Sequence, residues 1–345
     1  MNRSEAVLMM LFPFALFAAD YTVRPAHARP AVEEAHVKID SKLPVYHAAG
    51  ALSGSLKGIQ SDTTPGITKL WIEDFKKLYP NVSIQCDIAG SGAAGPVLTN
   101  DSADFGFIAR EMMIKEETPF RQKFGYEPLA IAVSGGSYRT LAFTDALAFF
   151  VNKDNPLDKL TFAQIDAIYS KTRKRGAPED ITKWGQLGLK GEWADKPIHL
   201  VGVKIENGFE HFLQQRVLDY GEWKDNIEVR DTVIPLAEIV AADKYAIGYA
   251  GFAYLKPGVK TLAIAREAKG PYYKGTLEEV ASQKYPLSRY IFIYVNKRPG
   301  KPLDPKLVEF VKFALSREGQ QDVVKDGIFL PLPAEDAKRQ LAKLK

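Results

Sequence analysis

Residues 82–111 read VSIQCDIAGSGAAGPVLTNDSADFGFIARE. Apolar residues alternate through residues 82–88, which predicts a strand, and the apolar residues of 103–108 predict a second one. Between them lie a glycine-rich loop and a segment long enough for only a short helix. A strand, a helix and a strand in this order predict an α/β architecture with mostly parallel sheets.

The same alternation continues on both sides of this stretch. Upstream, a short strand precedes Thr64-Pro65, and proline suits the first helical position because its missing N–H would have no partner there. Downstream, Thr161 is a predicted N-cap. No period of 20–50 residues recurs, which excludes a solenoid or propeller. The predicted strands are 56–60, 129–133, 146–151 and 290–295, and the predicted helices begin at Pro65, Phe162 and Phe209.

Length and composition describe a soluble globular protein. The 345 residues are enough for two domains, and 46% apolar with 26% charged residues is an ordinary mixture. The formal net charge of +4 is far below that of a nucleic-acid-binding protein, so we expect no nucleic-acid partner. The basic cluster at residues 171–175 is read as a solvated loop.

The N-terminus predicts export. An apolar run at residues 7–19 follows Arg3 and is too short to span a bilayer. Ala26-His27-Ala28 fits the small-x-small cleavage rule, so residues 1–28 are the predicted signal peptide and residues 29–49 a leader into the fold; Ala18 or Ala19 is a second candidate for the cleavage site. A buried N-terminal helix is the alternative. The mature protein is expected in the periplasm, without a lipid anchor.

Cysteine and histidine give no sign of a metal site or a cofactor. Cys86 is the only cysteine, and the five histidines show no metal-ligand spacing. We therefore expect neither.

Four loops have the form of anion-binding sites. They carry hydroxyls, glycines or a cation at strand ends, where ligands bind in open α/β sheets. N–H groups at helix starts attract anions there. The candidate ligand-binding residues are Thr63, Thr64, Ser91, Gly92, Arg110, Lys204, Asn207 and Gly208.

Each loop has a simpler interpretation. Thr64 is first of all a helix N-cap, Arg110 a surface ion pair, and Asn207-Gly208 a turn. Residues 90–95 also match the dinucleotide pattern G-x-G-x-x-G. That loop follows the second strand rather than the first, and an exported protein rarely meets NAD, so dinucleotide binding is disfavoured.

Taken in order, the segments resemble the phosphate-binding proteins of bacterial ABC transporters. The resemblance covers roughly residues 52–333. It is carried by the Ser/Thr-rich loop before the helix with Trp71, and by Tyr79-Pro80-Asn81-Val82, Gly90-Ser91-Gly92, Ala103-Asp104-Phe105-Gly106, Ala109-Arg110-Glu111, Asn155-Pro156-Leu157, Ala246-Ile247-Gly248-Tyr249, Tyr285-Pro286-Leu287-Ser288-Arg289 and Leu315-Ser316-Arg317-Glu318-Gly319-Gln320.

The resemblance implies a type II periplasmic binding protein fold, two α/β lobes joined by a two-strand hinge. Lobe one would comprise residues 50–145 plus 286–345, and lobe two residues 146–285. A small oxyanion, by resemblance phosphate, would be captured between the lobes. Hinge closure would then signal to an ABC transporter permease. We expect a monomer.

One departure from the family pattern weakens phosphate binding. The family has an arginine and Ser-Gly-Thr before the second-lobe helix, and residues 206–208 are Glu-Asn-Gly instead. No arginine lies near Gly202, although Lys204 is close. The alternative is therefore a degenerate family member that binds another ligand or acts as a sensor or adhesion protein.

Hydrolase motifs are missing. The sequence has neither a G-x-S-x-G elbow nor an H-E-x-x-H pair. We expect no enzymatic activity.

Overall fold

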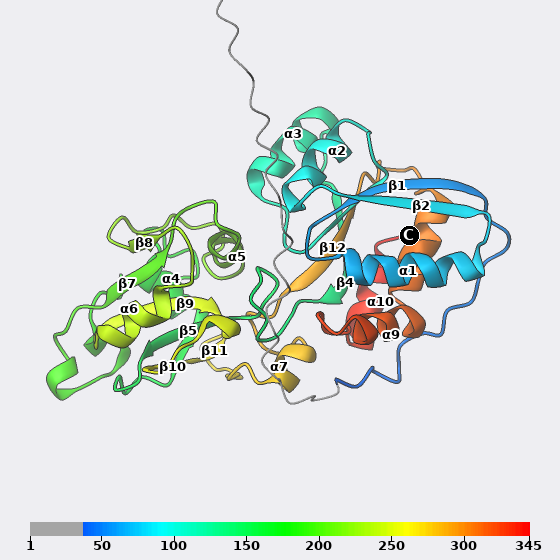
Figure 1. Cartoon of the computed structure of the whole chain (residues 1–345). Coiled ribbons are helices and arrows are strands. Elements are labelled where there is room, and N and C mark those ends of the chain that lie inside the picture. Colours follow the sequence, from blue (N-terminus) through cyan, green and yellow to red (C-terminus); the bar gives the residue numbers. More distant parts are fainter. Residues whose placement is uncertain (1–36) are drawn as a thin grey trace, which may run out of the picture. The chain divides into compact units, whose positions relative to one another are not determined.

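The computed structural model describes residues 37–345, which form one compact unit. The predicted signal peptide and the first part of the predicted leader lie outside these residues. The described chain forms two five-stranded sheets with helices packed on them (Figure 1). This is the α/β class that the alternation of strands and helices predicts.

The first sheet has the strand order β2-β1-β3-β12-β4. Strand β1 pairs in parallel with β2 and β3, whereas β12 is antiparallel to both β3 and β4. The strands are β1 (Gly54–Gln60), β2 (Val82–Ile88), β3 (Phe105–Ile108), β4 (Leu129–Gly135) and β12 (Tyr290–Val295).

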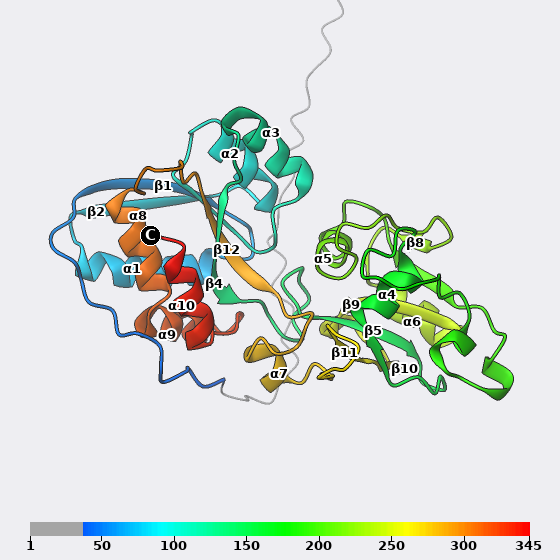
Figure 2. The ribbon, with the colours of Figure 1, turned by 180° about the vertical axis from the view of Figure 1, so that it is seen from behind.

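Side chains on the two faces of this sheet enter two different cores. Phe105 and Phe107 of β3 face one core, and Ile108 faces the other, as the two-residue period of a strand requires. Helices α1 (Pro65–Leu78), α8 (Pro305–Ala314), α9 (Arg317–Asp326) and α10 (Ala334–Ala342) cover the first face; α2 (Ala94–Thr99) and α3 (Ile114–Phe124) cover the second (Figure 2).

The second sheet has the strand order β10-β5-β9-β7-β8. Only β5 runs against the other four strands. Its strands are β5 (Leu147–Asn152), β7 (His199–Val203), β8 (Glu228–Arg230), β9 (Ala246–Gly251) and β10 (Val259–Thr261). A separate parallel pair joins β6 (Lys159–Thr161) to β11 (Ala263–Ala265).

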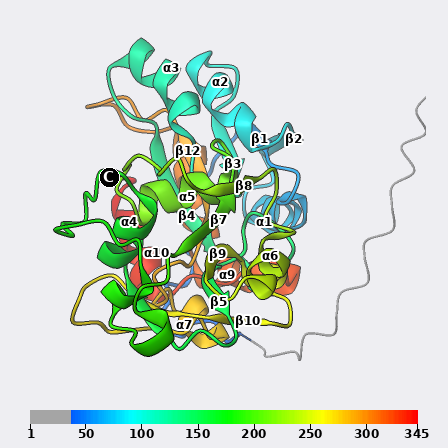
Figure 3. The same ribbon diagram turned by 90° about the vertical axis from the view of Figure 1, so that its left-hand side faces the viewer.

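Helices pack on the second sheet around one large core. Strands β5, β7 and β9 lie between α4 and α6 in Figure 3. Thr161 caps α4 through a hydrogen bond from the N–H of Gln164, as the sequence predicts. The helices of this part are α4 (Phe162–Tyr169), α5 (Gly208–Arg216), α6 (Leu236–Ala242) and α7 (Leu277–Ala281), and its short 3-10 turns are η2 (Trp184–Leu187), η3 (Gly191–Trp193) and η4 (Phe252–Tyr254). A further 3-10 turn, η1 (Ser91–Ala93), lies between β2 and α2 of the first sheet.

The chain passes between the two sheets in two segments, residues 136–146 and 286–289. The second segment is hydrogen-bonded to the first and to the start of β5: the N–H of Gly136 donates to the carbonyl of Arg289, and that of Leu147, in β5, donates to the carbonyl of Leu287. We call these two segments the passages. The first leads into β5 and the second into β12, and each of these strands is the one that runs antiparallel to its neighbours in its sheet. The exact lobe boundaries at residues 145 and 286 stay predictions.

Candidate functional site

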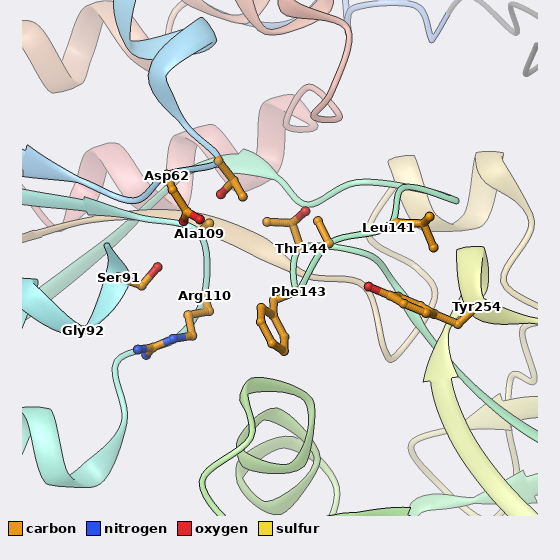
Figure 4. A pocket seen from close by; sticks show the side chains of 11 residues that line it. Asp62, Ser91, Gly92, Ala109, Arg110, Leu141, Phe143, Thr144 and Tyr254 are labelled. Atoms are coloured by element: carbon orange, nitrogen blue, oxygen red, sulfur yellow. The ribbon is translucent and has the colours of Figure 1, made fainter. Parts of the chain in front are cut away.

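A cleft of about 430 Å³ opens where strands of the first sheet end. Strands β1, β2 and β3 are parallel, so the loops that follow them meet at one edge of the sheet. The lining residues are Asp62, Thr63, Ser91, Gly92, Ala109, Arg110, Leu141, Ala142, Phe143, Thr144 and Tyr254 (Figure 4). Four of the predicted ligand residues, Thr63, Ser91, Gly92 and Arg110, are therefore brought together.

The loop after β1 contributes a hydroxyl and a carboxylate. Thr63 Oγ1 shares a hydrogen bond of 3.1 Å with Ser61 Oγ. Asp62 is exposed at the cleft and was missed by sequence reasoning, although it stands inside the predicted hydroxyl loop. Thr64, the next residue after Thr63, is fully buried and does not line the cleft. Its Oγ1 donates to the carbonyl of Ser61 at 3.1 Å.

The side chain of Thr64 also makes no cap for α1, although Thr64 occupies the N-cap position. Neither the N-cap hydrogen bond nor a place in the cleft lining is observed for it.

Arg110 is the cation of the cleft, and its orientation is fixed. Its Nη1 donates to Glu116 Oε2 at 2.8 Å and its Nη2 to Oε1 at 2.6 Å, while Nη1 also reaches the carbonyl of Glu111 at 2.8 Å. Both side chains are largely buried. A bidentate ion pair of this kind holds the guanidinium plane of Arg110 in place and offsets its positive charge.

Glu116 is itself held by the start of α3. The N–H of Met113 donates to its Oε2 at 2.8 Å. Gly92 and Gly95 pass close by: a Cβ on Gly92 would lie 3.4 Å from Glu116 Oε1, and one on Gly95 would lie 2.3 Å from the Glu116 carbonyl oxygen. Glycine at 95 therefore lets α2 approach the start of α3.

The predicted second-lobe ligands lie outside the cleft lining. Lys204 is 63% exposed, and its Nζ pairs with Asp231 at 2.8 Å. Asn207 is the N-cap of α5, with its Oδ1 accepting from the N–H of Phe209 at 3.0 Å. Gly208 is buried beside the cleft, where a Cβ would lie 3.2 Å from the ring of Phe143. Their role as ligands stays a prediction.

Glu206, which stands where the family has serine, is paired. Its Oε2 lies 2.9 Å from Nζ of Lys115 on α3. The pair joins the loop before α5 to the first-sheet half of the chain, and both side chains are more than half exposed. The negative charge of Glu206 is therefore offset by Lys115.

An aromatic and aliphatic wall completes the cleft. Leu141 and Phe143 come from the passage between β4 and β5, and Tyr254 comes from η4. The ring of Phe143 lies 5.2 Å from that of Phe209, which in turn lies 6.0 Å from that of Tyr254. None of these side chains was singled out from the sequence.

Two titratable groups lie near this wall. Burial raises the pKa of Asp145 to about 7, and its Oδ2 accepts from the N–H of Ala253 at 2.8 Å. Burial, together with the charge of Asp145, raises the pKa of Tyr254. The phenol of Tyr254 therefore stays protonated in the cleft.

Behind the cleft, a buried arginine joins the two halves. Arg289, in the second passage, is 0% exposed, and its Nη2 lies 2.9 Å from Oε2 of Glu111. Its guanidinium carbon lies 4.1 Å from the ring centre of Phe212 on α5. Nε2 of His211 is 3.3 Å from the carbonyl of Met112. Helix α5 is thus packed against the loop that carries Arg110.

Residues 37–345 contain no group of three His, Cys, Asp or Glu side chains that could hold a metal ion. Across that same part of the chain, every helix falls short of the length and apolar character needed to cross a bilayer.

A model of the PBP superfamily domain matches residues 47–318. The phosphate-binding protein PstS of Pseudomonas aeruginosa is 40% identical over 306 residues, which are 89% of this chain and 92% of that protein. The phosphate-binding protein PstS of Staphylococcus aureus is 27% identical over 300 residues, covering 85% of this chain and 83% of that protein.

Two solved structures share the fold. PstS from Borrelia burgdorferi matches with a TM-score of 0.53 and 19% identity, covering 81% of this chain and 99% of that one. An ABC-type phosphate transport receptor from Vibrio cholerae matches with a TM-score of 0.51 and 19% identity, covering 80% of this chain and 100% of that one.

Proposed function

The chain belongs to the PstS family of phosphate-binding proteins within the PBP superfamily, and we propose that it captures phosphate in the cleft and presents it to the permease of an ABC transporter. The observation that carries the proposal is the convergence of Thr63, Ser91 and Arg110 on one cleft from three successive strand ends. Hydroxyls and a guanidinium are donors suited to a tetrahedral oxyanion. The protein acts as a receptor, without a reaction step.

Asp62 supplies the selectivity in this proposal. A carboxylate at the cleft accepts a hydrogen bond from a protonated phosphate, whereas sulfate carries no proton at neutral pH and is repelled. The same carboxylate would let arsenate, which is also protonated, bind in the place of phosphate.

The lobes in this proposal are those of the sequence, residues 50–145 plus 286–345 and residues 146–285. The paired passages serve as the hinge, and closure around the anion is what the permease recognises. Residues 1–28 are removed on export, and the mature protein works in the periplasm as a monomer.

Calorimetry on protein stripped of bound anions tests the proposal. Phosphate and arsenate should give heat, and sulfate should not. Ser91→Ala removes one neutral hydrogen bond, worth about 0.5–1.5 kcal/mol, and should weaken phosphate binding about 2- to 13-fold. Arg110→Ala removes a charge-assisted bond of about 1.5–3 kcal/mol and should weaken it roughly 10- to 150-fold.

Arg121→Ala is the matched control. Arg121 pairs with Glu127 on the surface at 3.1 Å and does not line the cleft, so phosphate affinity should not change. The absence of heat with phosphate, arsenate, sulfate and molybdate alike would refute the proposal.

A further inference from the structure

The two sheets contribute unequally to the cleft. Thr63, Ser91 and Arg110 bring hydrogen-bond donors from loops that follow strands of the first sheet. Among the described residues that line the cleft, Tyr254 is the one that follows a strand of the second sheet, because η4 comes directly after β9. Strand β9 runs parallel to β7. Tyr254 therefore stands at the carboxyl end of a parallel strand, the position at which open α/β sheets bind ligands.

The hydroxyl of Tyr254 is available to a ligand. Figure 4 shows it pointing into the cleft, toward Phe143 and Thr144. Within residues 37–345 this hydroxyl makes no hydrogen bond to the protein, whereas the hydroxyl of Thr144 shares one of 2.8 Å with Ser137. Because the pKa of Tyr254 is raised, the phenol carries its proton at neutral pH. It can therefore donate a hydrogen bond to an anion.

The backbone and the ring of Tyr254 are both held in place. The N–H of the preceding residue, Ala253, donates to Oδ2 of Asp145 in the first passage at 2.8 Å. The ring of Tyr254 lies edge-on to that of Phe209, with 6.0 Å between the ring centres and 83° between the ring planes. A side chain held in this way loses little conformational entropy when it binds a ligand.

The donors that were expected from the loop before α5 are engaged elsewhere. The Oδ1 of Asn207 caps α5, and Nζ of Lys204 is paired with Asp231. Glu206 stands in place of a serine hydroxyl, and its carboxylate accepts hydrogen bonds instead of donating them. From the side of the second sheet, the hydroxyl of Tyr254 is the donor that lies in the cleft lining of the described chain.

From this arrangement we infer that Tyr254 is a phosphate ligand, whose hydroxyl donates a hydrogen bond to a phosphate oxygen from the side of the second sheet. The hydroxyl takes the part that the family resemblance assigns to Ser-Gly-Thr before the second-lobe helix. The inference rests on the proposed function, because phosphate occupies the same cleft. It adds that a single anion is bound by donors from both sheets.

Tyr254→Phe tests the inference, because it removes the hydroxyl and keeps the ring. In calorimetry on protein stripped of anions, the variant should bind phosphate about 2- to 13-fold more weakly than the parent, the effect of one hydrogen bond. Its thermal unfolding without phosphate should match that of the parent, because the hydroxyl bonds to no group in residues 37–345. A hydroxyl with only a structural role would change the unfolding instead.

Tyr220→Phe is the matched control. Tyr220 is an exposed tyrosine outside the cleft lining, so loss of its hydroxyl should leave phosphate affinity unchanged. If Tyr254→Phe binds phosphate as tightly as the parent, the inference is wrong and the proposed function stands. A variant that binds more weakly but also unfolds at a lower temperature without phosphate would overturn the inference too. No heat with phosphate for the parent protein would defeat the inference and the proposed function together.

Discussion

Replacing Glu111 by Gln should destabilise the fold more than any comparable change on the surface. Oε2 of Glu111 lies 2.9 Å from Nη2 of Arg289, and the two side chains are 7% and 0% exposed. Glutamine keeps the volume and one carbonyl oxygen but removes the counter-charge. Burial already lowers the pKa of Arg289, a sign that its charged form is poorly solvated.

The magnitude follows from this burial. Removing one partner of a buried ion pair leaves an uncompensated charge and costs about 3–5 kcal/mol. The ring of Phe212, 4.1 Å from the guanidinium carbon, supplies some cation–π attraction but cannot replace a full charge. We therefore expect Glu111→Gln to lower the free energy of unfolding by about 3–5 kcal/mol.

Urea unfolding followed by tryptophan fluorescence measures this change. Trp71 is buried beside the first sheet and Trp184 beside the second, so both halves contribute to the signal. The control is Glu73→Gln, which removes an exposed pair with Lys69 at 3.8 Å and should cost less than about 1 kcal/mol.

A double variant separates charge from packing. Glu111→Gln with Arg289→Met leaves no buried charge, so it should recover much of the stability lost in the single variant. The reasoning is refuted if Glu111→Gln stays within about 1 kcal/mol of the parent protein, or if the double variant is less stable than the single one.

Two further predictions concern the surroundings of the cleft. Asp145→Asn should gain stability relative to the parent protein as pH rises, because the carboxyl of Asp145, whose pKa is raised from 3.8 to about 7, favours the fold only while it is protonated. The gain should grow between about pH 4 and pH 7 to roughly 4 kcal/mol at most. Parallel pH profiles of thermal unfolding for the variant and the parent would contradict this prediction. Gly95→Ala should lower the free energy of unfolding by about 1–3 kcal/mol and weaken phosphate binding, because the added Cβ would lie 2.3 Å from the carbonyl oxygen of Glu116, whose side chain holds Arg110. If the urea midpoint and the phosphate affinity are both unchanged, the close approach of α2 to α3 at Gly95 is unimportant.

Much of the fold follows from local patterns. The alternation at residues 82–88, the Thr64-Pro65 start of α1 and the cap at Thr161 are each encoded within a few residues, and each element appears where predicted. Local signals suffice here because strand and helix periods are properties of neighbouring residues. The antiparallel placement of β5 and β12 was not predicted, since pairing depends on contacts distant in sequence.

The candidate site was likewise predicted only in part. From the sequence, one could infer that loops after parallel strands would meet, and Thr63, Ser91, Gly92 and Arg110 line one cleft. Lys204 lies outside the lining, and its Nζ is paired with Asp231, which is 27 residues away in the sequence and lies beside it only in the folded chain.

The α/β class, the family resemblance and four residues of the cleft lining could be predicted from the sequence, because each depends on residues within a short segment. The bond between Glu116 and Arg110, and the shared wall of Leu141, Phe143 and Tyr254, could be recognised only in the folded chain. The physical reason is that charge pairing and shared walls depend on distances in space, and segments far apart in the chain acquire those distances only on folding.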